Sequence, residues 1–212
     1  MDSQRFDRVF PEDDTDRSKE KEALFQMLNK MSDEQEKPIS TKRYQVAIDP
    51  GNTHTALVVV EIETKKIVDS YKLPNEEMRK KLHEIRYVKY GGDCCDFAIE
   101  MVASYGMPVG RSVFDTCLWI GRYIEIWGAA RLITRIMAKN HICKSTRATD
   151  ANIRQSLMDR YGSTREAAVG TKKNPGPMYG MGNDERAALA VALTAIETKS
   201  AYEMSKAEEI PR

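Results

Sequence analysis

The stretch YQVAIDPGNT, residues 44–53, is the part of the sequence that decides the fold. Its first six residues have the pattern of a buried strand that ends in an acid, and Pro50 then opens a turn. Residues 55–62 and 66–71 are rich in apolar and β-branched side chains, which favour strands, and a tight turn at 64–65 joins them. The sequence therefore predicts that the domain opens with an antiparallel meander of three strands.

The elements that follow alternate between helices and strands. A fourth strand is expected at residues 97–102, with Glu100 inside it. The predicted helices cover residues 75–88, 112–138, 149–161 with Thr149 as its N-cap, and 184–199, and residues 142–143 form a short fifth strand. This order predicts an α/β protein with a mixed five-stranded sheet, in which three antiparallel strands are extended by parallel strands and helices flank both faces.

The chain divides into an arm and a domain. Residues 1–40 are polar and acidic, and residues 1–37 carry 11 acids against 7 bases. Apolar residues at helical spacing predict a short amphipathic helix near residues 18–31. We expect residues 1–40 to form a flexible arm and residues 41–212 to form one globular domain.

The composition excludes several classes of protein. The 212 residues include 33 Lys and Arg against 32 Asp and Glu, and 41% of them are hydrophobic. That fraction is too high for global disorder, and the apolar runs are far shorter than the ~18 residues of a membrane helix. The four cysteines form no C-x-x-C pair, so neither a zinc site nor a disulfide frame is expected. The first ten residues lack an apolar signal core, which predicts a cytoplasmic protein without a membrane partner.

The nearly neutral total hides a strongly basic segment, residues 131–173. This segment holds ten bases and three acids. Local basicity of this size favours a polyanionic partner such as nucleic acid, although a solvated helix face would have the same composition. The candidates for phosphate contacts are Lys144, Arg147, Arg154, Lys172 and Lys173. Such contacts would position a duplex without reading its sequence.

Three carboxylates stand at unusual places in the sequence. Asp49 ends an apolar strand, Glu100 lies inside another, and Asp184 begins an apolar helix. Strands disfavour carboxylates, and buried ones are costly unless they are paired or bind a metal. Asp49 also suits the start of a turn, and Asp184 suits the positive end of a helix dipole. Together the three would suit two divalent cations about 4 Å apart, the arrangement that cleaves phosphodiesters, and Mg²⁺ prefers such oxygen ligands.

The chain resembles RuvC-type Holliday junction resolvases of the RNase H-like superfamily, and within them the phage and prophage branch. The resemblance covers about residues 44–198. Five motifs carry it in order: IDPGNT (48–53), IE (99–100), LWIGR (118–122), TRATDANIRQ (146–155) and NDERAALAVA (183–192). The loop GTKKNPGPMYG (170–180) is the most specific stretch.

The resemblance implies an RNase H-like fold and a homodimeric endonuclease that cuts two opposed strands of a four-way DNA junction. It implies that Asp49, Glu100 and Asp184 hold two Mg²⁺ ions, with Mn²⁺ as a substitute. One ion would activate the attacking water and the other would stabilise the leaving 3′ oxygen. Lys139 aligns with a family lysine and is the expected cation at the scissile phosphate. Tyr105 lies where family members place an aromatic wedge at the junction centre.

Two positions depart from the family pattern. Typical members carry another acid three residues after the one that aligns with Asp184, and this chain has Ala187 there. Glu185 cannot simply replace it, because neighbouring helix residues point about 100° apart. A second family lysine aligns with Asp150. The fourth metal ligand is therefore open between Glu185, after a backbone shift, and Asp150, which also suits a helix N-terminus.

Two other functions remain open on the sequence alone. Residues 49–55 also resemble the first phosphate loop of actin-like kinases, in which Asp49 would serve ATP, although the chain shows no second phosphate loop and no adenosine motif. Alternatively, the alanine at position 187 would suit a non-catalytic protein that binds junctions without cutting them.

Overall fold

The structure, a computed structural model, describes residues 42–90, 94–104, 106 and 108–208, with side chains as far as residue 198. The described residues belong to the unit that follows Ser40. The predicted arm at 1–40, with its helix near residues 18–31, lies outside the described residues, and so does Tyr105. In this described part of the chain, no helix is both long enough and apolar enough to cross a bilayer.

A mixed sheet of five strands forms the centre of the fold. Its strands are β1 (Tyr44–Pro50), β2 (His54–Glu61), β3 (Ile67–Pro74), β4 (Cys95–Met101) and β5 (Arg131–Thr134). They lie in the order β3-β2-β1-β4-β5. Strands β1, β2 and β3 form an antiparallel meander, whereas β4 pairs parallel with β1 and β5 pairs parallel with β4. This confirms the mixed five-stranded sheet that the sequence predicts.

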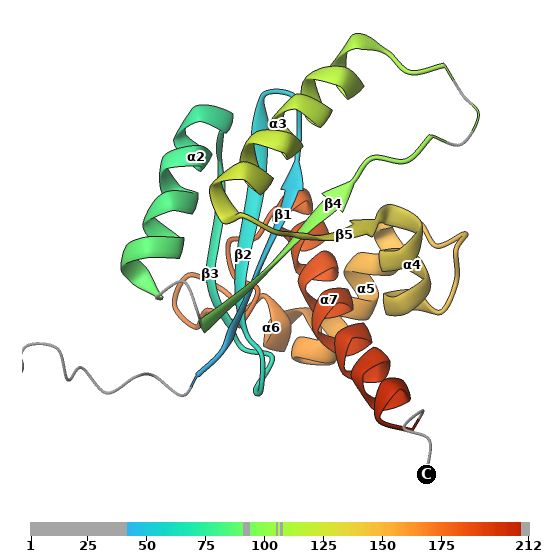
Figure 1. The fold of residues 1–212 in the computed structure, drawn as a ribbon. Helices are drawn as coiled ribbons and strands as arrows, with labels where there is room; N and C mark the ends of the chain where they lie inside the picture. Colours follow the sequence, from blue (N-terminus) through green and yellow to red (C-terminus); the bar gives the residue numbers. More distant parts are fainter. Residues whose placement is uncertain (1–41, 91–93, 105, 107, 209–212) are drawn as a thin grey trace, which may run out of the picture. The chain divides into compact units, whose positions relative to one another are not determined.

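Helices cover both faces of the sheet, as Figure 1 shows. They are α2 (Asn75–Glu84), the π-helical turn η1 (Ile85–Lys89), α3 (Arg111–Trp127), α4 (Arg135–Cys143), α5 (Asp150–Tyr161), α6 (Arg165–Ala168) and α7 (Asn183–Glu208). Helices α2 and α3 lie over one face, whereas α7 crosses the other face with α4 and α5 packed against it. The described chain is therefore a three-layer α/β fold.

Alternation along the strands builds a separate core on each face of the sheet. Val46 and Ile48 of β1 point toward α2 and α3 and join the core on that side. Ala47 points the other way, toward α7, whose residues 188–196 are all buried. Small side chains on the strand and the helix let the two backbones approach closely. Asp49, two residues after Ala47, shares its face and is therefore directed to the α7 side of the sheet.

One predicted helix and one predicted strand are wrong. The structure divides residues 112–138 into α3, the strand β5 and the first part of α4. Gly128 ends α3 with a φ of 86°, a conformation that glycine adopts without strain. Residues 131–134 then pair with β4, which satisfies backbone groups at its open edge. Residues 142–143, the predicted fifth strand, form the end of α4.

Side chains cap the two helices that begin near the candidate site. The hydroxyl of Thr149 accepts a hydrogen bond from the backbone N–H of Asn152, whose side chain accepts one from the backbone N–H of Thr149. This capping box confirms the predicted start of α5. At α7, the carboxylate of Glu185 accepts a hydrogen bond from the backbone N–H of Gly182 at 3.1 Å. Glu185 is therefore engaged as a cap of its own helix.

Candidate active site

Asp49 and Glu100 are neighbours at the carboxyl ends of two parallel strands. Ile48 of β1 is paired with Ile99 of β4, so the next residue on each strand is level with the other. Residues in register on parallel strands point to the same face of the sheet. Both acids therefore lie on the α7 side, where only 13% of the Glu100 side chain is exposed.

The same row of the sheet brings a lysine to the site. Asp49 pairs with Ala56 on β2, and Ala56 pairs with Lys72 on β3. The Nζ of Lys72 lies 2.6 Å from Oδ2 of Asp184, in the first turn of α7. Both of these side chains are about half exposed. The ion pair holds Asp184 beside the row of the sheet that carries Asp49.

Arg135 links Glu100 to a further acid of the site, Asp150. It is the first residue of α4, directly after β5, and its guanidinium donates to Oε1 of Glu100 at 3.2 Å and to Oδ1 of Asp150 at 2.8 Å. Asp150 is the first residue of α5 and exposes 71% of its side chain. Arg135 therefore connects the nearly buried Glu100 to the solvent-exposed rim of the site.

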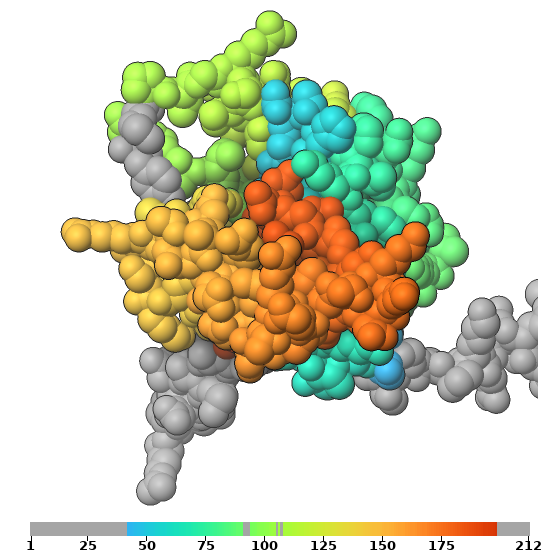
Figure 2. All heavy atoms as spheres, turned by 180° about the vertical axis from the view of Figure 1, so that it is seen from behind, coloured from blue at the N-terminus to red at the C-terminus, as the bar shows by residue number. Residues whose placement is uncertain are grey.

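Four of these side chains, Asp49, Arg135, Asp150 and Asp184, line an open cleft of about 200 Å³. The cleft is lined by Asp49, Arg135, Asp150, Ala151, Ile153, Arg154, Asn183, Asp184, Arg186 and Ala187. Figure 2 shows the face of the molecule on which α4 and α5, in yellow and orange, meet the orange-red start of α7. The lining contains three carboxylates and three guanidinium groups, so it offers ligands to a cation and donors to an anion.

Burial and repulsion by neighbouring acids raise the pKa values of the two strand acids. The pKa of Asp49 rises to about 7, first because its carboxyl group is buried and then because Glu100 lies beside it. Asp184 and Asp150 add to this repulsion, whereas Arg135 opposes it. Burial also raises the pKa of Glu100, against the attraction of Arg135. A site in which adjacent carboxyl groups resist ionisation is one that a bound cation would stabilise.

The donor chemistry of the cleft fits a hard divalent cation. Asp49, Asp150 and Asp184 line it, Glu100 is adjacent in the sheet, and the lining contains no His or Cys. Sets of oxygen ligands suit Mg²⁺ rather than Zn²⁺. Among the described residues, no three His, Cys, Asp or Glu side chains lie close enough together to enclose one ion. Three of the acids, Glu100, Asp150 and Asp184, instead form ion pairs with Arg135 or Lys72.

Lys139 and Arg135 lie on the same helix, but only Arg135 lines the cleft. Lys139, which the family resemblance links to the scissile phosphate, does not line the cleft, although its charge opposes the rise in the pKa of Glu100. Arg135, one turn earlier on α4, contacts Glu100 directly. In the sequence, Arg135 is one of the ten bases of residues 131–173, and nothing local distinguishes it from the others. Recognition of β5 would have revealed it, because β5 pairs with β4 and delivers residue 135 to the end of that strand.

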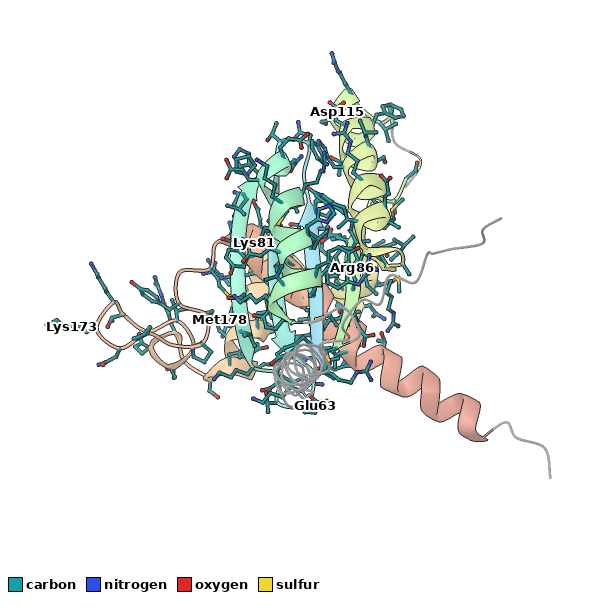
Figure 3. The ribbon with its side chains drawn as sticks, turned by 60° about the vertical axis from the view of Figure 1, so that its left-hand side comes forward. Glu63, Lys81, Arg86, Asp115, Lys173 and Met178 are labelled. Carbon is teal, nitrogen blue, oxygen red and sulfur yellow. The ribbon has the colours of Figure 1, made fainter. Side chains whose placement is uncertain are left out.

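The predicted phosphate contacts fall into two groups. Arg154 lines the cleft. The others are exposed outside it: Lys144, Arg147, Lys172 and Lys173. Figure 3 shows Lys173 at the outer end of the 170–180 loop, pointing away from the protein, whereas Met178 lies against the body of the fold, where it is fully buried. The buried methionine anchors a loop whose lysines are free to reach solvent or a ligand.

The fold is RNase H-like, with a mixed sheet in the order β3-β2-β1-β4-β5 and acids at the ends of its two central strands. It is similar to the structure of RuvC from Thermus thermophilus, with 16% sequence identity and a TM-score of 0.53 over 74% of this chain and 96% of that chain. T. thermophilus RuvC in complex with a Holliday junction substrate gives 15% identity, 75% and 96% coverage, and the same TM-score. No family model matches the sequence, and no curated protein matches it. The two structures confirm the predicted RuvC-like fold.

Proposed function

We propose that the protein is a Mg²⁺-dependent endodeoxyribonuclease that resolves four-way DNA junctions. The observation that supports the proposal is that Asp49 and Asp184 line one cleft, while Glu100 lies level with Asp49 on the neighbouring parallel strand. The fold is shared with RuvC, and one of the similar structures is RuvC with a Holliday junction substrate. The basic residues around the cleft supply what a polyanionic substrate requires.

Asp49, Glu100 and Asp184 would hold the metal, with Asp150 as a fourth carboxylate. Asp150 is a better candidate than Glu185, because it lines the cleft and its charge acts on both strand acids. Glu185 is engaged in capping α7 and is not part of the lining. When bound, Mg²⁺ would supply an activated water and would stabilise negative charge on the leaving oxygen.

Basic residues in and around the cleft would control its charge. Arg135 and Lys72 neutralise acids in the metal-free protein, so the site can fold without an unbalanced cluster of negative charge. The raised pKa of Asp49 keeps part of that carboxyl protonated near neutral pH in the metal-free protein, so Mg²⁺ binding is expected to strengthen as the pH rises through about 7. Lys139 lies close enough to influence Glu100 and would oppose the negative charge that develops on a phosphate.

The arms of the junction would lie on the exposed bases outside the cleft. Lys172 and Lys173 project from the 170–180 loop, and Lys144 and Arg147 follow one another across the turn between α4 and α5. Each would neutralise a backbone phosphate, which positions a duplex without reading its sequence. Tyr105, which lies outside the described residues, remains our proposed wedge at the junction centre.

A homodimer is part of the proposal, because two opposed strands need two active sites. An exposed apolar surface on α3 supports it: 63% of Phe114 and 56% of Leu118 are exposed, and the four-residue spacing places them on one face of the helix. Exposed apolar patches of this kind mark interaction surfaces. Sedimentation velocity of the wild type and of Leu118→Glu tests this point, and the variant is expected to shift toward monomer.

A labelled four-way junction and a linear duplex of matched sequence, each with Mg²⁺ or with EDTA, provide the test. The proposal predicts symmetric nicks in the junction alone, in Mg²⁺ alone, with ends that a DNA ligase seals. Junction binding that is equal in Mg²⁺ and EDTA, with no cutting by the wild type, would identify a non-catalytic binding protein.

The 49–55 stretch has a structural explanation that does not involve ATP. A Cβ on Gly51 would lie 2.5 Å from the carbonyl oxygen of His54, so the tight return from β1 to β2 requires glycine. The side chain of Asn75 donates to the carbonyl oxygen of Gly51 at 3.0 Å and fixes the turn. The turn therefore gives no support to the kinase alternative. ATP hydrolysis by the purified protein would favour that alternative.

A further inference from the structure

Two arginines line the cleft without an ion-pair partner among the described side chains: Arg154 on α5 and Arg186 on α7. The Nε of Arg186 is buried, and no acceptor for it exists in the described part of the protein. Its Nη1 donates only a long hydrogen bond, 3.3 Å, to Oδ1 of Asn183. A buried donor without an acceptor is costly, so the site favours an acceptor from outside the protein.

The two guanidinium groups also repel each other. The pKa of Arg186 is lowered, first by burial and then by the charge of Arg154, with Arg165 adding to the effect and Glu185 opposing it. By contrast, Arg135 in the same cleft is paired with acids. Like charges held together beside an unsatisfied donor create a local preference for an anion.

We propose that Arg154 and Arg186 form a subsite that binds one phosphate of the DNA backbone beside the carboxylates. Arg154 follows Asp150 by four residues on α5, so the two share a helix face about one turn apart. Arg186 follows Asp184 within the first turns of α7. A phosphate between the two guanidinium groups would accept several charge-assisted hydrogen bonds. The inference rests on the proposed nuclease function and names the side chains that seat its substrate.

The test measures binding of the full-length protein to a four-way junction in EDTA over a series of KCl concentrations. Arg154→Gln and Arg186→Gln are each expected to weaken binding roughly tenfold. Each is also expected to lower the slope of log K against log salt by about 0.9. Arg186→Lys, which keeps the charge, should retain most of the slope. Arg79→Gln is the matched control, because Arg79 is an exposed arginine on α2, paired with Glu76, and should leave the slope unchanged.

A second measurement uses inorganic phosphate without DNA. At low salt Arg154→Gln should raise the thermal midpoint of the metal-free protein, since it removes the repulsion on Arg186, whereas the loss of an arginine that merely supports the fold would lower it. Phosphate should raise the midpoint of the wild type but not that of the double variant. Unchanged salt slopes in both single variants would overturn the subsite even if the wild type cuts junctions. An arginine-dependent response to phosphate in a protein that neither binds nor cuts junctions would retain the subsite and reject the nuclease.

Discussion

The Nζ of Lys72 lies 2.6 Å from Oδ2 of Asp184, so a strand lysine neutralises an acid that the proposed function assigns to the metal. The lysine must be displaced from the acid, or must share it, when a cation binds. Lys72→Ala is therefore expected to raise the affinity for Mg²⁺ by roughly two- to fivefold, the range of an exposed ion pair. Isothermal titration calorimetry measures this, with Lys80→Ala on α2 as the control. A fall in affinity would show instead that Lys72 holds Asp184 in its binding position.

The raised pKa of Asp49 predicts how the metal-free protein responds to pH. In the folded protein this carboxyl retains its proton up to about pH 7, whereas the unfolded chain loses it near the ordinary value of 3.8. Between these values the folded state binds more protons, so the free energy of unfolding should decrease as the pH rises from 4 to 7. The total decrease is on the order of a few kcal/mol. Urea denaturation in EDTA at a series of pH values measures it.

Asp49→Asn is the control for that pH dependence, because it removes the titrating group while it preserves the shape of the side chain. The variant should be more stable than the wild type at pH 8 without metal and should show a flatter curve. Some slope should remain, since the pKa of Glu100 is raised as well. An unchanged curve in Asp49→Asn would show that this carboxyl is not the group that titrates.

The role of Asp150 as the fourth metal ligand can be tested by removing its charge and placing an acid at position 187. Asp150→Asn is expected to weaken Mg²⁺ binding about tenfold, because it removes a ligand that lines the cleft. Ala187→Asp, which introduces an acid from α7 into the lining of the same cleft, should restore the affinity in the double variant. Asp159→Asn, farther along α5 and exposed, is the matched control. Calorimetric affinities that are equal for Asp150→Asn and the wild type would exclude Asp150 as a ligand.

Lys172 and Lys173 are expected to increase the affinity for DNA without affecting the preference for a DNA sequence. The pair of changes Lys172→Ala and Lys173→Ala is expected to weaken binding to junctions of different sequence alike. Each lost phosphate contact should lower the salt slope by about 0.9. Binding titrations with several junctions in EDTA measure both effects. A loss confined to one junction sequence would indicate that the loop reads bases.

The elements of the fold that follow local rules could be predicted from the sequence. The antiparallel meander and the capped start of α5 at Thr149 depend on neighbouring residues, and both are present in the structure. Strand β1 runs one residue past Asp49, to Pro50. The strand β5 was missed because its four residues lie between two helices and continue their apolar pattern. Its existence depends on the open edge of β4, which is a tertiary contact that local propensity does not encode.

In the candidate site, too, some residues could be predicted from the local sequence, whereas others depend on tertiary contacts. The acids stood out because carboxylates at strand positions conflict with local preference. The cations that bond them did not stand out, because lysine and arginine are ordinary on a surface. Lys72 reaches the site through the register Asp49–Ala56–Lys72 across three strands, and Arg135 reaches it through β5. Neither relation is visible until the pairing of the strands is known.

The most direct test of the central claim compares cleavage and binding of a four-way junction by the wild type and by Asp49→Asn, Glu100→Gln and Asp184→Asn. The account predicts that the wild type nicks the junction in Mg²⁺, and that each variant binds the junction in EDTA with wild-type affinity but does not cut it when Mg²⁺ is added. Cleavage at the wild-type rate by a folded variant would contradict the claim that these three carboxylates form the nuclease centre.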